Sequence, residues 1–450
     1  MARKSKKRPE ALAQTPEVLQ RGLLVGWRDA DAPKPRFGFE VNNAPPTIGA
    51  FEPVLHEAEG HIITIAPTGA GKGRGAIIPN LLTYPGSAIV IDPKGEAAAV
   101  TARRRREMGQ DVFIVDPFRV VTQKPDSLNP FDVFDMADTE IDIEAETLAT
   151  LLSGEVGVSK DAFWDLQGRA LVSGVIAYVA QCETPQNRHF GRVRDILKGD
   201  DPVHFMAMTL DNVKNLNRLS HQTFAAFCTT TDVTRSGILS TAQSYTTVLG
   251  SDAATRTLGP STIDLQALRR GEAMTIFLVV PPSRLGSHGA MFRLWVAALM
   301  FAVMSRNSMV DRRTLFIIDE CAQLGRFDLL LRAMTLLRSY SLQVWAFLQD
   351  LSQLKQLYPQ DWPTVVNNAG VLQIFGVRNH MMARELADMI GDIDAQGLRM
   401  LPPDKLVALK SGSEAEILKR PDYLTDPAFD GTFDPNPLFR RASEGAARDV

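Results

Sequence analysis

The chain has 450 residues, of which 45% are hydrophobic and 22% charged, and its formal net charge at pH 7 is −3. This length predicts about two to four domains with a sizeable core. The nearly balanced charge excludes a protein that is basic over its whole surface, so any contact with nucleic acid has to use a local patch. The three cysteines, Cys182, Cys228 and Cys321, show no metal-binding spacing and suggest no disulfide framework, which favours a reducing cytoplasm.

The first part of the chain is polar and rich in proline. We expect residues 1–45 to form an extended or disordered N-terminal arm whose one apolar island, residues 23–27, packs through Trp27. The longest apolar run, residues 294–304, is shorter than the roughly 20 residues of a membrane-spanning helix. We therefore interpret this run as part of a core helix.

A strand-like run at residues 62–66 breaks into a glycine-rich turn and then into helical spacing. Such a turn aims backbone N–H groups, the positive end of a helix and the charge of Lys72 at one point, which suits a triphosphate. This motif opens a nucleotide-binding domain whose first part we place at residues 46–137. The predicted nucleotide-binding residues are Thr68, Gly69, Ala70, Gly71, Lys72, Gly73 and Arg74.

The turn departs from the usual P-loop pattern G-x-x-x-x-G-K-[ST] at both ends, where Ala66 and Gly73 stand. Gly73 lacks the hydroxyl that normally ligates Mg²⁺. A nearby carboxylate, a water molecule or Thr68 would have to take that coordination position. The alternative interpretation is a glycine-rich turn that binds nothing.

Strand-like runs at residues 62–66, 88–92 and 112–116 alternate with helical stretches, which predicts a right-handed βαβαβ unit. Asp92 and Asp116 follow two of these strands, at the edge where open parallel sheets bind ligands. Either could line the nucleotide pocket, although for Asp116 we favour a simple strand end. We interpret Arg103 to Arg106 as a solvated helix C-terminus.

Helical patterns dominate residues 138–245, which we predict to be an inserted all-α domain. Its clearest helix begins near Phe163 and Trp164, which we expect in the core; stacking on bases would require them to be exposed. Strand-like and helical patterns alternate again over residues 246–428, which we predict to be the second part of the nucleotide-binding domain. Both parts together have seven predicted strands, which indicates a doubly wound α/β domain. Residues 429–450 are expected to form an extended or disordered C-terminal tail.

One later strand, residues 315–318, is continuously apolar and ends in the acid pair Asp319 and Glu320. We predict that Asp319 holds Mg²⁺ and that Glu320 polarises the water that attacks the γ-phosphate. Such acids can also serve only to cap the following helix. The presence of Gly71-Lys72 behind another strand of the same chain favours the catalytic interpretation.

Taken together, these motifs resemble the type IV secretion coupling proteins, the TraG-like conjugative DNA-transfer ATPases. The matching segments follow the order of the family over about residues 60 to 428: 66–73, 79–82, 85–87, 92–96, 116–118, 128–131, 163–164, 236–242, 318–325, 348–350, 353–354, 367–368 and 423–426. Glycine after the P-loop lysine, as at Gly73, is common in this family.

The resemblance implies a RecA-like P-loop NTPase with a mainly parallel doubly wound sheet and an inserted all-α domain, six copies of which form a ring around a channel. It implies ATP and Mg²⁺ as cofactors. The implied partners are DNA, a relaxase-type nucleoprotein and components of the secretion machine. Of the forms of DNA, single-stranded DNA is the one that we expect. Gln349 matches the glutamine that senses the γ-phosphate, and Arg338 resembles the arginine finger that reaches a neighbouring subunit's nucleotide. The alternative for Arg338 is a surface arginine at a helix end.

Coupling proteins usually begin with transmembrane helices, and this sequence shows none, so we expect a soluble variant in the cytoplasm, with peripheral contact at the inner membrane as an open alternative. The predicted function is ATP-driven recruitment and translocation of DNA or nucleoprotein to a type IV secretion machine. One alternative is a double-stranded DNA translocase of the chromosome-segregation type, which usually has serine or threonine at the position of Gly73. Another is an ATP-sensing substrate-docking module with little turnover.

Overall fold

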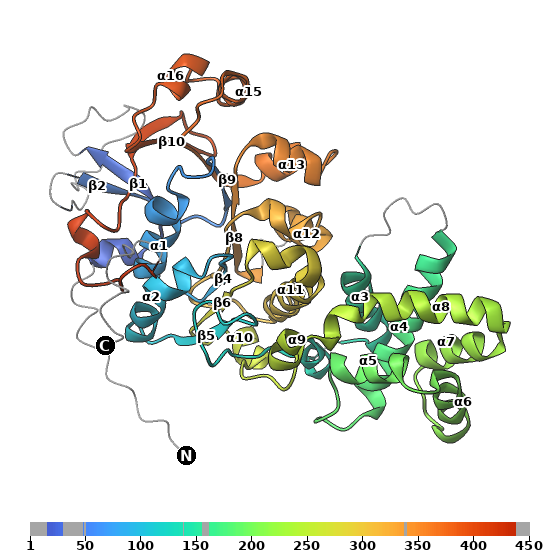
Figure 1. Ribbon diagram of the computed structural model, residues 1–450. Helices are drawn as coiled ribbons and strands as arrows, with labels where there is room; N and C mark the ends of the chain where they lie inside the picture. Colours follow the sequence, from blue (N-terminus) through green and yellow to red (C-terminus); the bar gives the residue numbers. More distant parts are fainter. Residues whose placement is uncertain are drawn as a thin grey trace, which may run out of the picture. The chain divides into compact units, whose positions relative to one another are not determined.

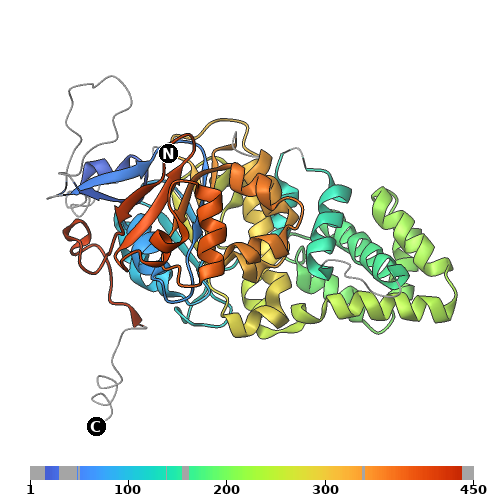
Figure 2. The same cartoon turned by 90° about the horizontal axis from the view of Figure 1, so that it is seen from above.

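The computed structural model describes residues 16–29, 48, 51–137, 139–154, 162–336 and 340–437. The chain divides into two compact units (Figures 1 and 2). The first comprises the described residues of 1–113, 273–278 and 309–450, and the second those of 114–272 and 279–308. Each unit is described by itself below.

A parallel sheet forms the centre of the first unit. Most of its strands are buried along their whole length because their residues are almost all apolar, as expected for strands covered on both faces. The edge strand at residues 111–115 is partly exposed. All seven strands predicted from the sequence are present, and the whole sheet has the order β2-β1-β11-β10-β9-β3-β8-β7-β4-β6-β5. The seven are β3 (His61–Ile65), β4 (Ala88–Ile91), β5 (Asp111–Val115), β6 (Met274–Leu278), β7 (Thr314–Ile318), β8 (Leu342–Leu348) and β9 (Ala369–Ile374).

Helices cover both faces of this sheet (Figure 1). Helices α1 (Ile78–Thr83) and α2 (Glu96–Glu107) lie on one face, and α12 (Asp328–Leu336) and α13 (Leu351–Leu357) lie on the other. The helices that follow β3 and β8 therefore lie on opposite faces although the two strands are neighbours. This arrangement makes the carboxyl ends of β3 and β8 a switch point, the place where open α/β sheets bind ligands. Three short helices complete the unit: α14 (Trp362–Asn367), α15 (His380–Ile390) and α16 (Ala395–Arg399).

Four antiparallel strands extend the sheet: β1 (Leu23–Asp29), β2 (Phe51–His56), β10 (Lys405–Lys410) and β11 (Glu416–Lys419). The expected N-terminal arm is therefore wrong for residues 16–29, which form a short 3-10 helix and strand β1. Strand β1 is ordered by pairing with β2 and with β11, which lies about four hundred residues later in the chain. Trp27, expected to pack, is 3% exposed.

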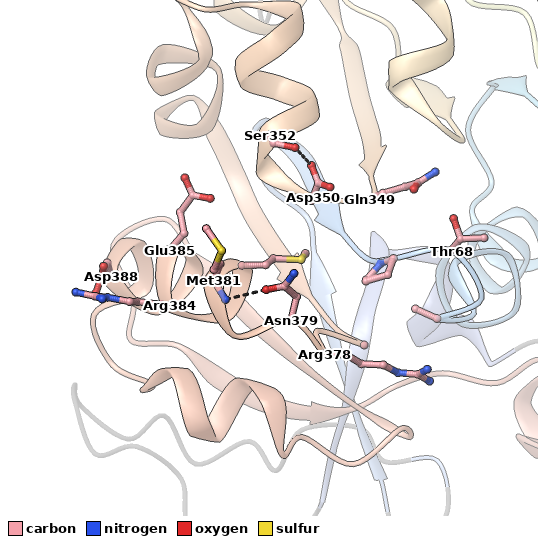
Figure 3. Close-up of a pocket in the computed structure, with 14 residues that line it drawn as sticks. Thr68, Gln349, Asp350, Ser352, Arg378, Asn379, Met381, Arg384, Glu385 and Asp388 are labelled. Atoms are coloured by element: carbon pink, nitrogen blue, oxygen red, sulfur yellow. Dashed lines mark hydrogen bonds between the residues drawn. The ribbon is translucent and has the colours of Figure 1, made fainter.

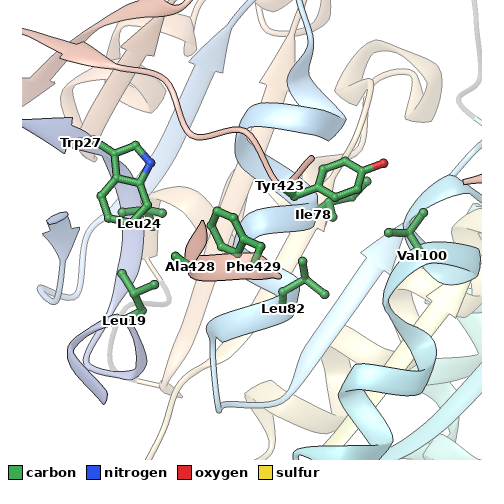
Figure 4. Close-up of a cluster of buried hydrophobic side chains, with 9 residues drawn as sticks. All are labelled: Leu19, Leu24, Trp27, Ile78, Leu82, Val100, Tyr423, Ala428 and Phe429. Carbon is green, nitrogen blue, oxygen red and sulfur yellow. The ribbon is translucent and has the colours of Figure 1, made fainter. Parts of the chain in front are cut away.

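The expected C-terminal tail is likewise wrong for the part of residues 429–450 that is described. Phe429 is fully buried, and the backbone N–H of Asp434 donates to the carbonyl of Val100 at 2.9 Å. Figure 4 shows why: apolar side chains from both ends of the chain pack on α1 and α2. The cluster comprises Leu19, Leu24, Trp27, Ile78, Leu82, Val100, Tyr423, Ala428 and Phe429. The proline and charged residues in the described part of residues 429–450 therefore belong to a packed loop.

Two polar side chains fix the surroundings of α1. The Asn80 side chain accepts from the backbone N–H of Leu24 at 2.7 Å and donates to its carbonyl at 3.0 Å, so it acts as a partner for β1. Arg105 is fully buried and donates to the carbonyl of Gly86 at 2.6 Å and to the Thr275 hydroxyl at 2.7 Å. The prediction of a solvated arginine run is wrong for Arg104 and Arg105, which are both buried. The Arg105 guanidinium also donates to the carbonyl of Tyr84, so it satisfies backbone acceptors of the turn after α1.

Helices make up the second unit, which is larger than the predicted insertion at residues 138–245. They are α3 (Ile141–Ser153), α4 (Ala162–Cys182), α5 (Phe190–Lys198), α6 (Pro202–Asn212), α7 (Arg218–Thr229), α8 (Asp232–Tyr245), α9 (Asp252–Thr257), α10 (Leu265–Arg269) and α11 (Pro282–Met304). Residues 114–137, 246–272 and 279–308 belong to this unit in addition. One contact that joins them is the hydrogen bond from the Trp295 indole of α11 to the carbonyl of Leu128, at 3.1 Å.

Within the described residues, α11 alone has the length and apolar composition of a membrane-spanning helix. However, 61% of its most apolar window is buried inside the protein. This burial agrees with the interpretation of residues 294–304 as part of a core helix.

The aromatic pair on α4 differs from the prediction of a core position. Phe163 is 47% exposed, and Trp164 is only partly buried. A Cβ atom at Gly237 of α8 would come within 2.4 Å of the Trp164 ring, so the six-membered ring of the indole packs closely against α8 at this glycine. The pair therefore packs on a helix surface.

Candidate nucleotide site

The glycine-rich turn leaves β3 and leads into a single π-helical turn, Gly73–Ile77, that continues as α1. Gly69 and Gly71 have φ angles of +77° and +90°, which side chains other than glycine rarely adopt. Gly73 has no such angle, so its backbone does not explain why the usual serine or threonine is missing. Two glycines with positive φ angles directly before a helix are compatible with the predicted phosphate-binding loop.

Lys72 points toward the end of β7. Its ammonium lies 3.3 Å from Oε2 of Glu320, and both side chains are largely shielded from solvent. Glu320 has a φ of +70°, a left-handed conformation that costs about 1–3 kcal/mol for a residue other than glycine. The lysine and one of the predicted acids, which lie far apart in the sequence, thus meet at one place.

Two glutamines hold the other oxygen of Glu320. Gln349, directly after β8, donates to Oε1 at 2.8 Å, and Gln353 donates to the same atom at 3.3 Å. Gln353 also accepts from the backbone N–H of Gln349 at 2.8 Å. No role for Gln353 was predicted from the sequence. It lies in the first turn of α13, four residues after Gln349.

Asp319 immediately follows β7, between Ile318 and Glu320. Burial raises the pKa of its carboxyl; the positive charge of Lys72 opposes this shift, while the negative charge of Glu320 adds to it. A partly desolvated carboxylate near a second acid is stabilised by a cation, and carboxylate oxygens are the ligands that Mg²⁺ prefers. The residues around Asp319 therefore fit the predicted Mg²⁺.

The two earlier acids have different roles. Asp92, directly after β4, is buried and accepts from the backbone N–H of Ala98 at 2.8 Å, and burial raises its pKa to about 7. Asp116 belongs to the second unit, where its carboxylate accepts from the backbone N–H groups of Val120 and Val121 at 2.9 and 2.6 Å. Asp116 thus closes a turn, in agreement with the simpler interpretation.

An arginine that sequence analysis missed supports the loop from behind. The Arg420 guanidinium donates to the carbonyl of Ala70 and would contact a side chain at Gly71, 2.9 Å from the position of its Cβ. Arg74, which is predicted to bind nucleotide, donates to Asp422 at 2.6 Å. Nothing in the local sequence around Arg420 points to the P-loop, because the two lie 350 residues apart.

A cavity of about 880 Å³ opens beside the loop (Figure 3). Thr68 of the loop and Gln349 line one side, and Asn379 and Met381, where α15 begins, line the other; Ala70 also lines the cavity. The predicted Thr68 thus faces the cavity, on the side of β8 and β9. Arg338 lies outside the described residues.

Several known proteins are similar to this chain in sequence. A family model described as type IV secretory system conjugative DNA transfer matches residues 21–397. The conjugal transfer protein TraG of Escherichia coli is 25% identical over 358 residues, which cover 74% of this chain and 52% of TraG. Protein VirD4 of Agrobacterium fabrum (strain C58) is 24% identical over 436 residues, which cover 86% of this chain and 63% of VirD4.

Among solved structures, the plasmid coupling protein TrwB in complex with ADP and Mg²⁺ matches with a TM-score of 0.62 at 16% identity, covering 87% of this chain and 93% of that one. A sulphate complex of TrwBdeltaN70 matches with a TM-score of 0.63 at 16% identity, covering 91% and 99%. These similarities confirm the predicted RecA-like α/β fold. The chain spans about half the length of TraG.

Proposed function

The chain belongs to the type IV secretory system conjugative DNA-transfer family, and from this premise we propose that it is an ATP-hydrolysing coupling protein that recruits DNA or nucleoprotein and moves it to a secretion machine. The observation that carries the proposal is the contact of Lys72 with Glu320, whose other oxygen is held by Gln349. These side chains supply a cation for phosphate, a general base and an amide that can sense the phosphate, at the ends of neighbouring strands.

The ion pair suggests how binding would prepare the base. A phosphate in the loop competes for Lys72, which then releases Oε2 of Glu320. Gln349 and Gln353 still hold Oε1, so the carboxylate stays in place and Oε2 can accept a proton from the attacking water. Mg²⁺, when bound near Asp319, would neutralise charge on the phosphates.

The proposed assembly is a homo-hexamer with single-stranded DNA or a relaxase-type nucleoprotein as cargo. The cavity beside Thr68 and Gln349 would give a neighbouring copy access to the nucleotide, and Arg338 is the proposed trans-acting arginine. Hydrolysis would then depend on assembly, because an arginine that stabilises the transition state raises the rate by orders of magnitude.

Steady-state ATPase measurements on the purified protein, with and without single-stranded DNA, test the proposed activity. Measuring the particle mass of the same samples tests the proposed assembly. We expect Lys72→Ala to abolish nucleotide binding, and Glu320→Gln to bind ATP but to hydrolyse it about 10²- to 10⁴-fold more slowly. Glu414→Gln, at an exposed acid of the same unit, is the matched control. Wild-type hydrolysis in both site variants would overturn the assignment. A persistent monomer without stimulation by DNA would favour the docking module instead.

A further inference from the structure

The carboxylate of Glu96 lies beside the P-loop at the residue where a hydroxyl is missing. A Cβ atom built on Gly73 would lie 3.7 Å from Oε2 of Glu96 and 3.9 Å from Oε1. Among the described residues, apart from the chain neighbours and the backbone of the same helix, the three heavy atoms nearest to that position all belong to Glu96. The side chain of a serine or threonine there would thus have Glu96 as its nearest neighbour.

Glu96 is held in place by the last part of the described chain. It is the first residue of α2, and its Oε1 accepts from the Asn436 side chain at 2.5 Å. Asn436 is itself buried and contacts the hydroxyl of buried Tyr423 at 3.5 Å. Tyr423 belongs to the apolar cluster of Figure 4, so the support is rigid. Oε2, the oxygen nearest Gly73, is the atom that this support leaves directed at the loop.

The surroundings of Glu96 favour a cation. Asp92 lies between β4 and Glu96, and Asp319 directly follows β7, so two further carboxylates lie at strand ends near Glu96. Strand β4, which leads to Glu96, is the neighbour of β7, which leads to Asp319. The competing candidate, Thr68, instead faces the cavity beside β8 and β9. Glu96, and not Thr68, therefore lies on the same side of the site as Asp319, the predicted Mg²⁺ ligand.

We propose that Glu96 completes the Mg²⁺ site in place of the missing hydroxyl, together with Asp319, and that Asn436 orients it. This inference rests on the proposed nucleotide-binding function. Mg²⁺ is usually bound in proteins by one or two carboxylates with phosphates and water. Within the described residues no three acidic, histidine or cysteine side chains are placed to hold an ion alone, so the metal should bind together with nucleotide.

Equilibrium binding of a fluorescent ADP to the full chain, titrated with Mg²⁺ and repeated in EDTA, tests the proposal. We expect Glu96→Gln to raise the Mg²⁺ concentration at half-maximal effect about 10- to 100-fold while leaving binding in EDTA unchanged. Asn436→Ala should give a smaller shift in the same direction. Glu107→Gln, at the other end of α2, removes the same charge and should have no effect.

A second variant separates metal binding from a structural role. Gly73→Ser supplies a hydroxyl, so the double variant Gly73→Ser with Glu96→Gln should recover most of the Mg²⁺ dependence that Glu96→Gln loses. Electron paramagnetic resonance of Mn²⁺ bound with ADP should rank the affinities of these variants for the metal in the same order. An unchanged Mg²⁺ dependence in Glu96→Gln, or equal weakening with and without metal, would overturn the role of Glu96 while leaving the nucleotide site intact. Failure of the wild-type chain to bind nucleotide would overturn the proposed function as well.

Discussion

The contact between Arg420 and the P-loop leads to a quantitative prediction. The carbonyl of Ala70 and the N–H of Gly71 belong to one planar peptide and point in opposite directions. Since Arg420 binds that carbonyl, it also fixes the direction of the Gly71 N–H, one of the groups that we propose to bind phosphate. The guanidinium also lies 5.5 Å from the ring centre of Phe375, which fixes its plane. Arg420 is therefore a positioning residue for the loop.

The expected effect follows from the strength of this hydrogen bond. A hydrogen bond from a charged donor contributes about 1.5–3 kcal/mol, and about 1.4 kcal/mol corresponds to a tenfold change in affinity. Water can replace part of the contact, so we expect Arg420→Ala to weaken nucleotide binding about tenfold. Arg420→Lys keeps the charge but loses the planar contact with Phe375. Its affinity for nucleotide should therefore lie between the affinities of the wild-type chain and of Arg420→Ala.

Anisotropy of a fluorescent nucleotide measures the dissociation constant directly, with circular dichroism as the check on folding. Arg399→Ala, at an exposed arginine of the same unit, is the control. A folded Arg420→Ala variant that binds within about twofold of wild type would refute the positioning argument. If Arg420→Lys bound like wild type and the defect of Arg420→Ala vanished in high salt, long-range charge would be the cause instead.

Three stability predictions concern the buried polar contacts of the first unit. Trp27→Phe keeps a ring but leaves the carboxylate of Asp426, 2.8 Å from the indole nitrogen, without that donor; chemical denaturation should show a loss of about 1–3 kcal/mol. Asn80→Ala removes both bonds to the backbone of Leu24, so hydrogen exchange of β1 amides should accelerate more than that of the central strands. Arg105→Met fills the same space without donors, and calorimetry should show a lower melting temperature than for the exposed control Arg399→Ala.

The parallel core and its acid pair could be predicted because their signals are local. Continuous apolar runs such as residues 315–318 indicate buried strands, and a lysine or acid directly after such a run lies at the ligand-binding edge. Strand β1 gave a weaker signal, since proline-rich polar sequence surrounds it and its partner β11 is far along the chain. Arg420 and Asn436 gave none, because only the folded chain brings them to the loop.

The residues that escaped prediction share a place in the fold. The loop and α1 are covered by the first and last described segments of the chain, and Asp426 joins the two. Its carboxylate accepts from Trp27 at 2.8 Å and from the backbone N–H of Asp422 at 2.9 Å, and Asp422 in turn binds Arg74. Because Arg74 follows the loop directly, a change at Trp27 has a continuous path of hydrogen bonds to the nucleotide site. The first and last described segments therefore contact the residue that follows the loop as well as stabilising the fold.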